Sequence, residues 1–261
     1  MLLTSVIIVL REVLEASLLV SILLALSGVL GISRRWIGWS LGIGLAGAFA
    51  YSLGMAVISD WFDGVGQEVT SAAIQFMIYL LLFLFILLVV RGTATRRMNA
   101  RQLMLIMAAT VSLAVMREGF EVIVYMQGYV SVLPRFVNML VGAVVGASIG
   151  ISIGALVYYL VSNLSYRKAL TVGIGLLSLV GAAMLSQGAL LLIQADWLPS
   201  QLPLWDSSAW LPEASVTGQL LYALIGYEAT PTALQASFYF GGLAILLVTM
   251  IAAVRSRKSS P

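Results

Sequence analysis

The sequence predicts an all-α integral membrane protein with seven transmembrane helices. Of its 261 residues, 61% are hydrophobic and only 10% are charged, whereas a soluble domain has about 25% charged residues. The mean hydropathy is +1.04. The apolar residues gather in seven segments, each long enough to cross the ~30 Å hydrocarbon core of a bilayer as a helix.

The segments differ in what interrupts them. The first and fourth contain charged residues within apolar runs, and the third and sixth are largely apolar with basic residues beside one end. The second and fifth are rich in small residues, which predicts close helix packing. A longer polar connection before the seventh could form a short interfacial helix at 216–226. The segments are 3–29, 36–58, 71–90, 103–127, 136–161, 169–193 and 232–254.

The charges between the segments predict how the chain is oriented. The loops after segments one, three, five and seven hold eleven lysines or arginines and no acidic residue, whereas the other three loops hold one arginine. Basic residues near span ends remain on the cytoplasmic side. The sequence therefore predicts an N-terminus outside the cell and a C-terminus in the cytoplasm.

A repeat follows from this order. Segments one and four carry the same motif, 106 residues apart, and each precedes a small-residue segment. Three segments per unit is an odd number, so the second copy must enter from the opposite side. The result is a three-plus-three inverted repeat with one C-terminal helix, a common transporter architecture. The single membrane domain 1–261 divides into repeats 1–101 and 102–194, an extracytoplasmic connection 195–231, and a seventh helix with a cytoplasmic tail, 232–261.

The motif is Arg-Glu-x-x-Glu, and it places three ionisable residues in an apolar helix. On a helix these positions fall within a ~100° arc, so each helix carries them on one face. A charge at mid-bilayer costs about 2.5–3.5 kcal/mol, so these groups must be compensated by one another, by water or by a bound ion. The six residues are Arg11, Glu12, Glu15, Arg117, Glu118 and Glu121.

The composition limits the chemistry of such a site. The chain has no cysteine and no histidine, which excludes thiolate and imidazole ligands and the usual nucleophile–base pairs of enzymes. Four glutamates and two arginines carry a net charge of −2 when ionised, which suits a multivalent cation. Oxygen ligands favour hard cations such as Fe(III), Mn, Mg or Ca. We expect the glutamates to bind the metal and the arginines to hold them in register, because guanidinium is a planar fork.

Two further groups of polar residues are candidates for the path of an ion. Polar groups within the segments could line it, although an interhelical hydrogen bond would explain each of them equally well. Acidic residues of the first outer loop could collect cations, although such carboxylates are ordinarily just solvated. The first group is Gln75, Tyr79, Tyr125 and Gln187, and the second is Asp60, Asp63 and Glu68.

Two Arg-Glu-x-x-Glu motifs in the first and fourth of seven spans resemble the oxidase-dependent iron permeases. That family includes the fungal high-affinity iron permease and bacterial EfeU-type transporters. The resemblance implies iron as the substrate and the four motif glutamates, Glu12, Glu15, Glu118 and Glu121, as its ligands. It also implies a separate extracytoplasmic ferroxidase or iron-binding protein as partner.

The expected function is therefore movement of Fe(III) or Fe(II) into the cell across a bacterial cytoplasmic membrane, along a path lined by glutamates. No permanently bound cofactor, enzymatic activity or nucleic-acid partner is expected; membrane lipid surrounds the chain, and it could assemble as a homo-oligomer. A carrier of another hard divalent cation, or a proton-coupled carrier, is the alternative within transport. A membrane scaffold whose arginines and glutamates only neutralise one another is the alternative outside it.

Overall fold

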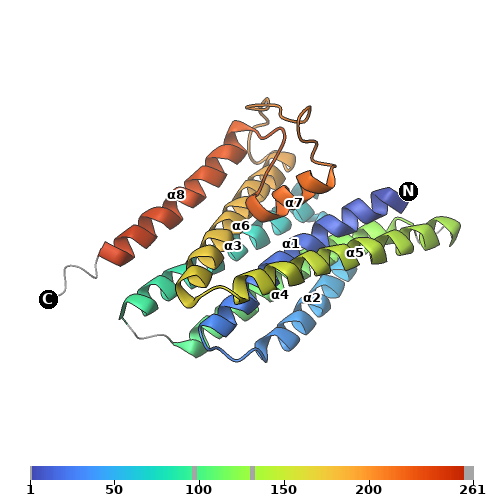
Figure 1. The fold of residues 1–261 in the computed structure, drawn as a ribbon. Helices are drawn as coiled ribbons and strands as arrows, with labels where there is room; N and C mark the ends of the chain where they lie inside the picture. Colours follow the sequence, from blue (N-terminus) through green and yellow to red (C-terminus); the bar gives the residue numbers. More distant parts are fainter. Residues whose placement is uncertain (1, 96–98, 130–132, 256–261) are drawn as a thin grey trace.

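The computed structural model describes residues 2–95, 99–129 and 133–255. Within these ranges the chain forms eight α-helices and one 3-10 helix, and its only strand-like pairing is an isolated bridge between Pro203 and Thr232 (Figure 1). The elements are α1 (Leu2–Val29), α2 (Trp36–Ser59), η1 (Trp61–Gly64), α3 (Gly66–Thr95), α4 (Ala100–Gln127), α5 (Leu133–Ser162), α6 (Tyr166–Gln194), α7 (Val216–Ile225) and α8 (Ala233–Arg255).

Six of the described helices are long and apolar enough to cross a membrane: α2 to α6 and α8. The first helix, α1, which carries three ionisable residues, is not among the six. It is nevertheless 28 residues long, or about 42 Å at 1.5 Å per residue. The seven-span count thus stays a prediction for α1, whereas the all-helical membrane fold is confirmed.

Two helix pairs are packed through glycine, as the small-residue segments predicted. A side chain on the α5 glycines would collide with the backbone of α1: a Cβ on Gly146 would lie 2.5 Å from the carbonyl oxygen of Val6. In the second pair, a Cβ on Gly44 of α2 would lie 2.7 Å from that of Val115 in α4. The contacts advance together along both members of each pair, so α1 runs parallel to α5, and α2 to α4.

The helix pairings have a regular pattern. α1 packs on α5, α4 on α2, α3 on α6, and α1 on α4. Exchanging α1 with α4, α2 with α5 and α3 with α6 turns α1–α5 into α4–α2 and leaves the pairings α3–α6 and α1–α4 unchanged. This is the arrangement an inverted repeat requires. The repeat itself and its boundaries at residues 101, 194 and 231 stay predictions.

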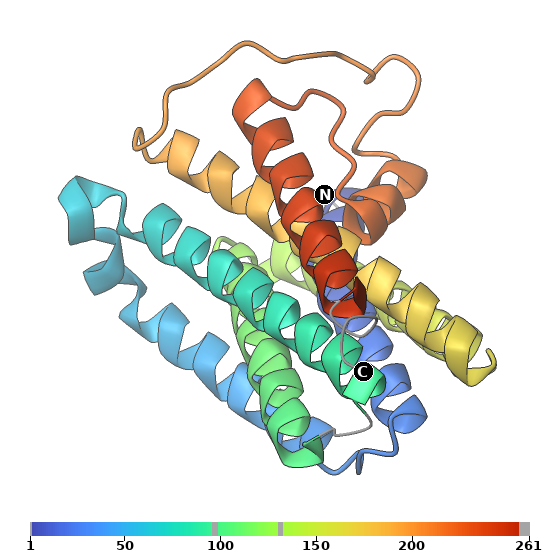
Figure 2. The same ribbon diagram turned by 90° about the vertical axis from the view of Figure 1, so that its left-hand side faces the viewer.

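Basic and acidic residues lie at opposite ends of the bundle. The links α1–α2 and α5–α6 lie at one end and the long connection before α8 at the other (Figures 1 and 2). The first end carries Arg34, Arg35, Arg167 and Lys168, and the connection carries Asp196, Asp206 and Glu213. This agrees with the charge pattern used to orient the chain. Arg96, Arg97, Arg257 and Lys258, which that pattern also included, lie outside the described residues.

Two local features depart from the sequence prediction or refine it. α3 begins at Gly66, five residues before the predicted segment, so Glu68 lies in its first turn rather than in a loop. A carboxylate there interacts favourably with the helix dipole. The predicted short helix at 216–226 is confirmed as α7. Ser215 caps its N-terminus by accepting a hydrogen bond from the Gly218 N–H, and Gly226 ends it in the left-handed conformation.

The glycine contact between α1 and α5 yields a testable prediction. Gly146→Ala should lower the free energy of unfolding by about 1–3 kcal/mol, because the added methyl group must push two backbones apart. Gly42→Ala is the matched control: that glycine lies on α2 with nothing within 4 Å of its Cβ position, and alanine favours a helix. Thermal unfolding in detergent, followed by tryptophan fluorescence, measures both. Equal melting temperatures would contradict close packing at Gly146.

Candidate metal centre

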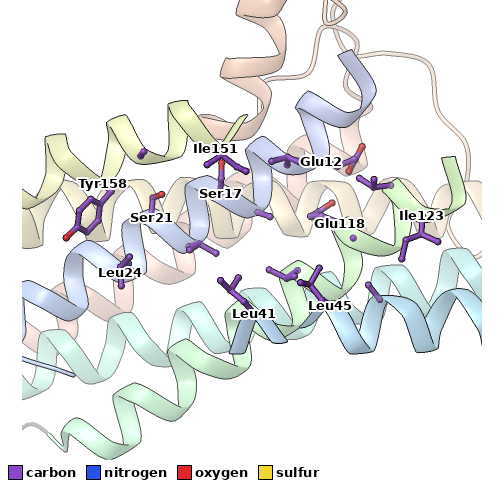
Figure 3. A pocket seen from close by; sticks show the side chains of 18 of the residues that line it. Glu12, Ser17, Ser21, Leu24, Leu41, Leu45, Glu118, Ile123, Ile151 and Tyr158 are labelled. Atoms are coloured by element: carbon purple, nitrogen blue, oxygen red, sulfur yellow. The ribbon is translucent and has the colours of Figure 1, made fainter. Parts of the chain in front are cut away.

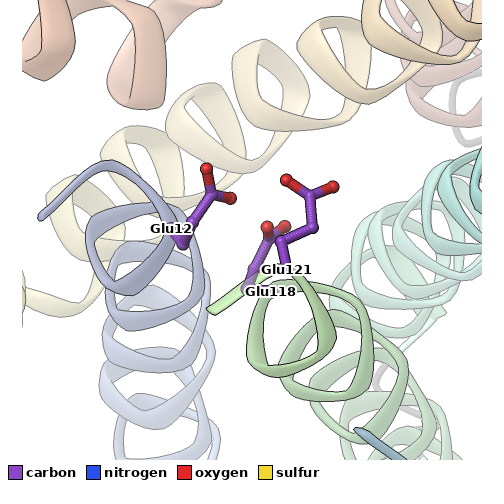
Figure 4. Close-up of side chains that lie close together, drawn as sticks. All are labelled: Glu12, Glu118 and Glu121. Atoms are coloured by element: carbon purple, nitrogen blue, oxygen red, sulfur yellow. The ribbon is translucent and has the colours of Figure 1, made fainter. Parts of the chain in front are cut away.

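The packing of α1 on α4 brings the two motifs together. Within the described residues, three glutamates form the one acidic group that could hold a metal ion, with one carboxylate oxygen from each lying within 4.8 Å of the others. Glu12 comes from α1, and Glu118 and Glu121 come from α4, with their carboxylates facing the same space (Figure 4). The site is therefore shared between the two predicted repeats.

These three carboxylates differ in exposure. Glu12 and Glu118 are buried, with 6% and 2% of their surface exposed, whereas the side chain of Glu121 is 33% exposed. Glu121 is also one helical turn nearer the acidic end of the bundle than Glu118. The three residues thus form a short series from a partly exposed carboxylate to two buried ones.

Arg117 is the central cation of the site. Its Nη1 lies 2.7 Å from Glu118 and its Nη2 lies 2.7 Å from Glu121, so one guanidinium holds both carboxylates of its own motif. Its side chain is only 6% exposed. Lysine could not make the same two contacts in this geometry, because it offers one nitrogen on a flexible chain. Arg117 therefore fixes the relative positions of two candidate ligands.

Glu15 occupies a different place from the other motif glutamates. It lies between the two arginines, 3.5 Å from Arg11 Nε and 3.7 Å from Arg117 Nη1, and it is not a member of the three-carboxylate group. Buried beside two guanidinium groups, it offsets their charge. The sequence could not separate this position from that of Glu12, because both lie on one helical face.

The net charge of the cluster and one carboxylate oxygen that lacks a hydrogen-bond donor both suit a bound cation. With the arginine–glutamate pair Arg11–Glu15 set aside, three carboxylates face one guanidinium, which leaves a net charge of −2 when all are ionised. In addition, Glu118 Oε2 is buried and accepts no hydrogen bond from the described residues. A buried acceptor without a donor is costly, and a bound cation would satisfy it.

Two of the four polar residues predicted within the segments form a hydrogen-bonded chain that begins at Glu15. Gln187 of α6 donates to Glu15 Oε2 at 3.1 Å, and Gln75 of α3 donates to Gln187 Oε1 at 2.7 Å. Both glutamines are buried. A continuous polar chain therefore runs from Glu15 to the α3–α6 contact, and it fixes the orientation of the Glu15 carboxylate.

The other two polar residues make hydrogen bonds between helices. Tyr79 donates to the Gly242 carbonyl of α8 at 3.0 Å, and the Tyr125 hydroxyl lies 2.7 Å from that of Ser5 in α1. Both tyrosines thus match the alternative to lining the ion path, which is an interhelical hydrogen bond. The outer acids Asp60 and Asp63 are exposed, and neither they nor Glu68 belong to the acidic group of the site.

Sequence reasoning missed Tyr222, which comes from α7. Arg11 lies over its ring, with 4.1 Å between the guanidinium carbon and the ring centroid, and donates a hydrogen bond to its hydroxyl. A cation–π contact and a charge-assisted hydrogen bond thus hold Arg11 beside Glu15. No sequence signal links residue 222 to residue 11, since their contact depends on how α7 folds back against α1.

Glu228, which follows α7, is a second acidic group close to the site that the sequence did not single out. Ser186 of α6 and Gln235 of α8 donate to its two carboxylate oxygens. Burial raises the pKa of Glu228 to about 7, and the charge of Glu213 adds to that effect. Glu228 therefore joins the connection between α7 and α8 to two helices of the bundle.

A cavity of about 720 Å³ adjoins the carboxylates (Figure 3). Its floor is formed by α1 and α4 and its walls by α2 and α5, and its lining is otherwise almost wholly apolar. Glu12 and Glu118 lie at one part of it, and Leu24 and Tyr158 lie toward the basic end of the bundle.

The sequence profile of the iron permease FTR1 family matches residues 2–259. The chain belongs to this family of iron permeases. The match covers nearly the whole chain, so it includes both motifs and all described helices. No curated protein sequence and no solved structure gives a significant match.

Membership in the FTR1 family confirms the resemblance drawn from the two motifs. Together with the six apolar helices, it makes the chain a multi-pass membrane protein of an iron-transporting class. The family is one of transporters, in agreement with the expectation of a non-enzyme. In this FTR1 family member, the three-carboxylate group is the natural candidate for the place where iron is bound.

The different surroundings of the motif glutamates predict a rank order of metal affinity. In the purified protein, Glu12→Gln, Glu118→Gln and Glu121→Gln should weaken iron binding most, because each replaces a negatively charged ligand by a neutral amide. Glu15→Gln should cost about 10–100-fold, the usual effect of altering a group beside the ligands. Asp63→Asn, on the exposed turn, is the control and should bind as wild type. Isothermal titration calorimetry measures all five; an effect of Glu15→Gln as large as that of Glu118→Gln would place Glu15 among the ligands.

Proposed function

We propose that this chain carries iron across the cytoplasmic membrane of a bacterium into the cell, and that Glu12, Glu118 and Glu121 bind the ion on its way. The observation that carries the proposal is the meeting of three carboxylates from α1 and α4 within 4.8 Å, in a chain of the iron permease family. Oxygen-only ligands with a net negative charge suit Fe(III), a hard cation, and accept Fe(II) as well.

The exposure of the three ligands suggests an order of use. Iron first meets Glu121, whose side chain is partly exposed near the acidic end of α4, and then passes to Glu118 one turn deeper and to Glu12 across the helix contact. Arg117 holds two of these carboxylates in place throughout. Glu15 neutralises the charge of Arg11 and also lies near Arg117, so the arginines repel the incoming cation less.

Beyond the site, toward the basic end, the contact between α1 and α4 is apolar. Leu19 and Ile22 of α1 pack with Met107 and Val111 of α4 in one buried apolar cluster. A cation cannot pass such a contact, because nothing there replaces its hydration shell. Release to the cytoplasm therefore requires a second conformation in which these helices separate, as in transporters built from inverted repeats. A separate extracytoplasmic ferroxidase or iron-binding protein delivers the ion.

Transport by the purified protein tests the function. Proteoliposomes containing the wild-type chain should accumulate radiolabelled iron, and Glu118→Gln should reduce the initial rate to near that of empty liposomes, while Asp63→Asn leaves it unchanged. An excess of manganese or magnesium should compete poorly. Competition as strong as that by unlabelled iron would assign the site to hard divalent cations in general. Equal rates with wild type and Glu118→Gln would remove this carboxylate from the path.

Labelling of single cysteines tests the orientation. The natural chain has no cysteine, so Ser200→Cys in the outer connection and Asn163→Cys between α5 and α6 each introduce a unique, exposed thiol. In intact cells a membrane-impermeant maleimide should label the first and not the second, and both should react after lysis. The reverse pattern would place the acidic end of the bundle in the cytoplasm and reverse the direction of the proposed path.

A further inference from the structure

The cavity beside the carboxylates is a groove on the side of the bundle that would face lipid. Leu45 of α2 and Ile151 and Tyr159 of α5 line it, and each is about 60% exposed. Contacts between the two walls, α2 and α5, are absent or minimal within the described residues. In a bilayer the groove therefore opens sideways into hydrocarbon. Away from the two carboxylates, the lining offers water few polar partners.

The dimensions of the groove fit an alkyl chain. From Glu12 to Leu24 it follows α1 for twelve residues, or about 18 Å at 1.5 Å per residue. One leaflet of a ~30 Å hydrocarbon core is about 15 Å thick. An extended alkyl chain lying along the apolar side chains of this groove would therefore span one leaflet.

Positive charge lies at the end of the groove that is nearest the basic end of the bundle. Tyr158 lines the groove near the basic end, and the guanidinium of Arg34 lies over its ring, 5.7 Å from the centroid. Arg34 is exposed, as is Arg35 beside it. Basic residues at a membrane surface attract anionic lipid headgroups by about 1 kcal/mol each. The charged mouth and the apolar groove thus match the two parts of one molecule.

We propose that the groove binds an anionic phospholipid, with one acyl chain lying along α1 and α4 and its phosphate group beside Arg34. The acyl chain gains little by leaving other lipids, because the bilayer interior is equally apolar. Selectivity therefore comes from the headgroup and from the shape of the groove. The bound chain reaches the level of Glu12 and Glu118 and separates these carboxylates from mobile lipid.

Native mass spectrometry of the purified protein, equilibrated with equal amounts of phosphatidylglycerol and phosphatidylcholine, tests the proposal. The wild type should retain one phosphatidylglycerol. Ala155→Trp fills the groove from an exposed position on α5 and should abolish retention. The control Leu160→Trp adds the same ring on the same helix, at an exposed position outside the groove lining, and should retain the lipid. All variants are compared only when they elute as single, symmetric peaks.

The charge is tested independently of the groove. Arg34→Gln should reduce the retention of phosphatidylglycerol relative to phosphatidylcholine by about fivefold, whereas Arg167→Gln, an exposed arginine at the same end, should leave it unchanged. Retention of both lipids alike, or of phosphatidylglycerol by Ala155→Trp, would overturn the proposal. So would a dimer that Ala155→Trp dissociates, since a second copy would then occupy the groove. Because lipid is measured rather than iron, none of these outcomes depends on the proposed transport.

Discussion

The structure depends on the burial of one guanidinium, that of Arg117, among carboxylates of two helices. An isolated charge inside a membrane protein is costly, and a buried pair that loses one partner leaves the other uncompensated. Arg117 contacts Glu118 and Glu121 on its own helix and Glu15 on α1. Its compensation is thus divided between the two predicted repeats. The α1–α4 contact satisfies the charges in both helices, and it is also what creates the candidate site.

Glycine packing holds both charged helices against a second partner. α1 is held parallel to α5, and α4 parallel to α2, by positions where no side chain would fit. Each charged helix therefore has a glycine-rich partner on its outer side and a charged partner on its inner side. Buried apolar side chains of α1, α3, α4 and α6 also pack together in one cluster and stabilise the α1–α4 contact. Some of these glycine contacts lie beside the motifs: a Cβ on Gly150 would meet Val13 of α1, and one on Gly47 would meet Met116 of α4.

The sequence predicted the helices well because lipid leaves the backbone few alternatives. It also predicted that the ionisable residues of each motif share one helical face, because their spacing fixes this on any helix. The start of α3 was misplaced because hydropathy detects the lipid-facing part of a helix, whereas Gly66 and Glu68 extend its hydrogen-bonded length. The separation of Glu15 from the other glutamates, and the contact of Tyr222 with Arg11, depend on tertiary packing that no local pattern encodes.

The apolar seam between Leu19, Ile22, Met107 and Val111 has a consequence for the energetics of the cell. A polar path open from end to end would let protons and sodium ions run down their gradients continuously. Leu19 and Ile22 are about one helical turn apart, as are Met107 and Val111, so this apolar layer is about one turn thick. In the conformation described, these side chains therefore separate the charged cluster from the basic end of the bundle between α1 and α4.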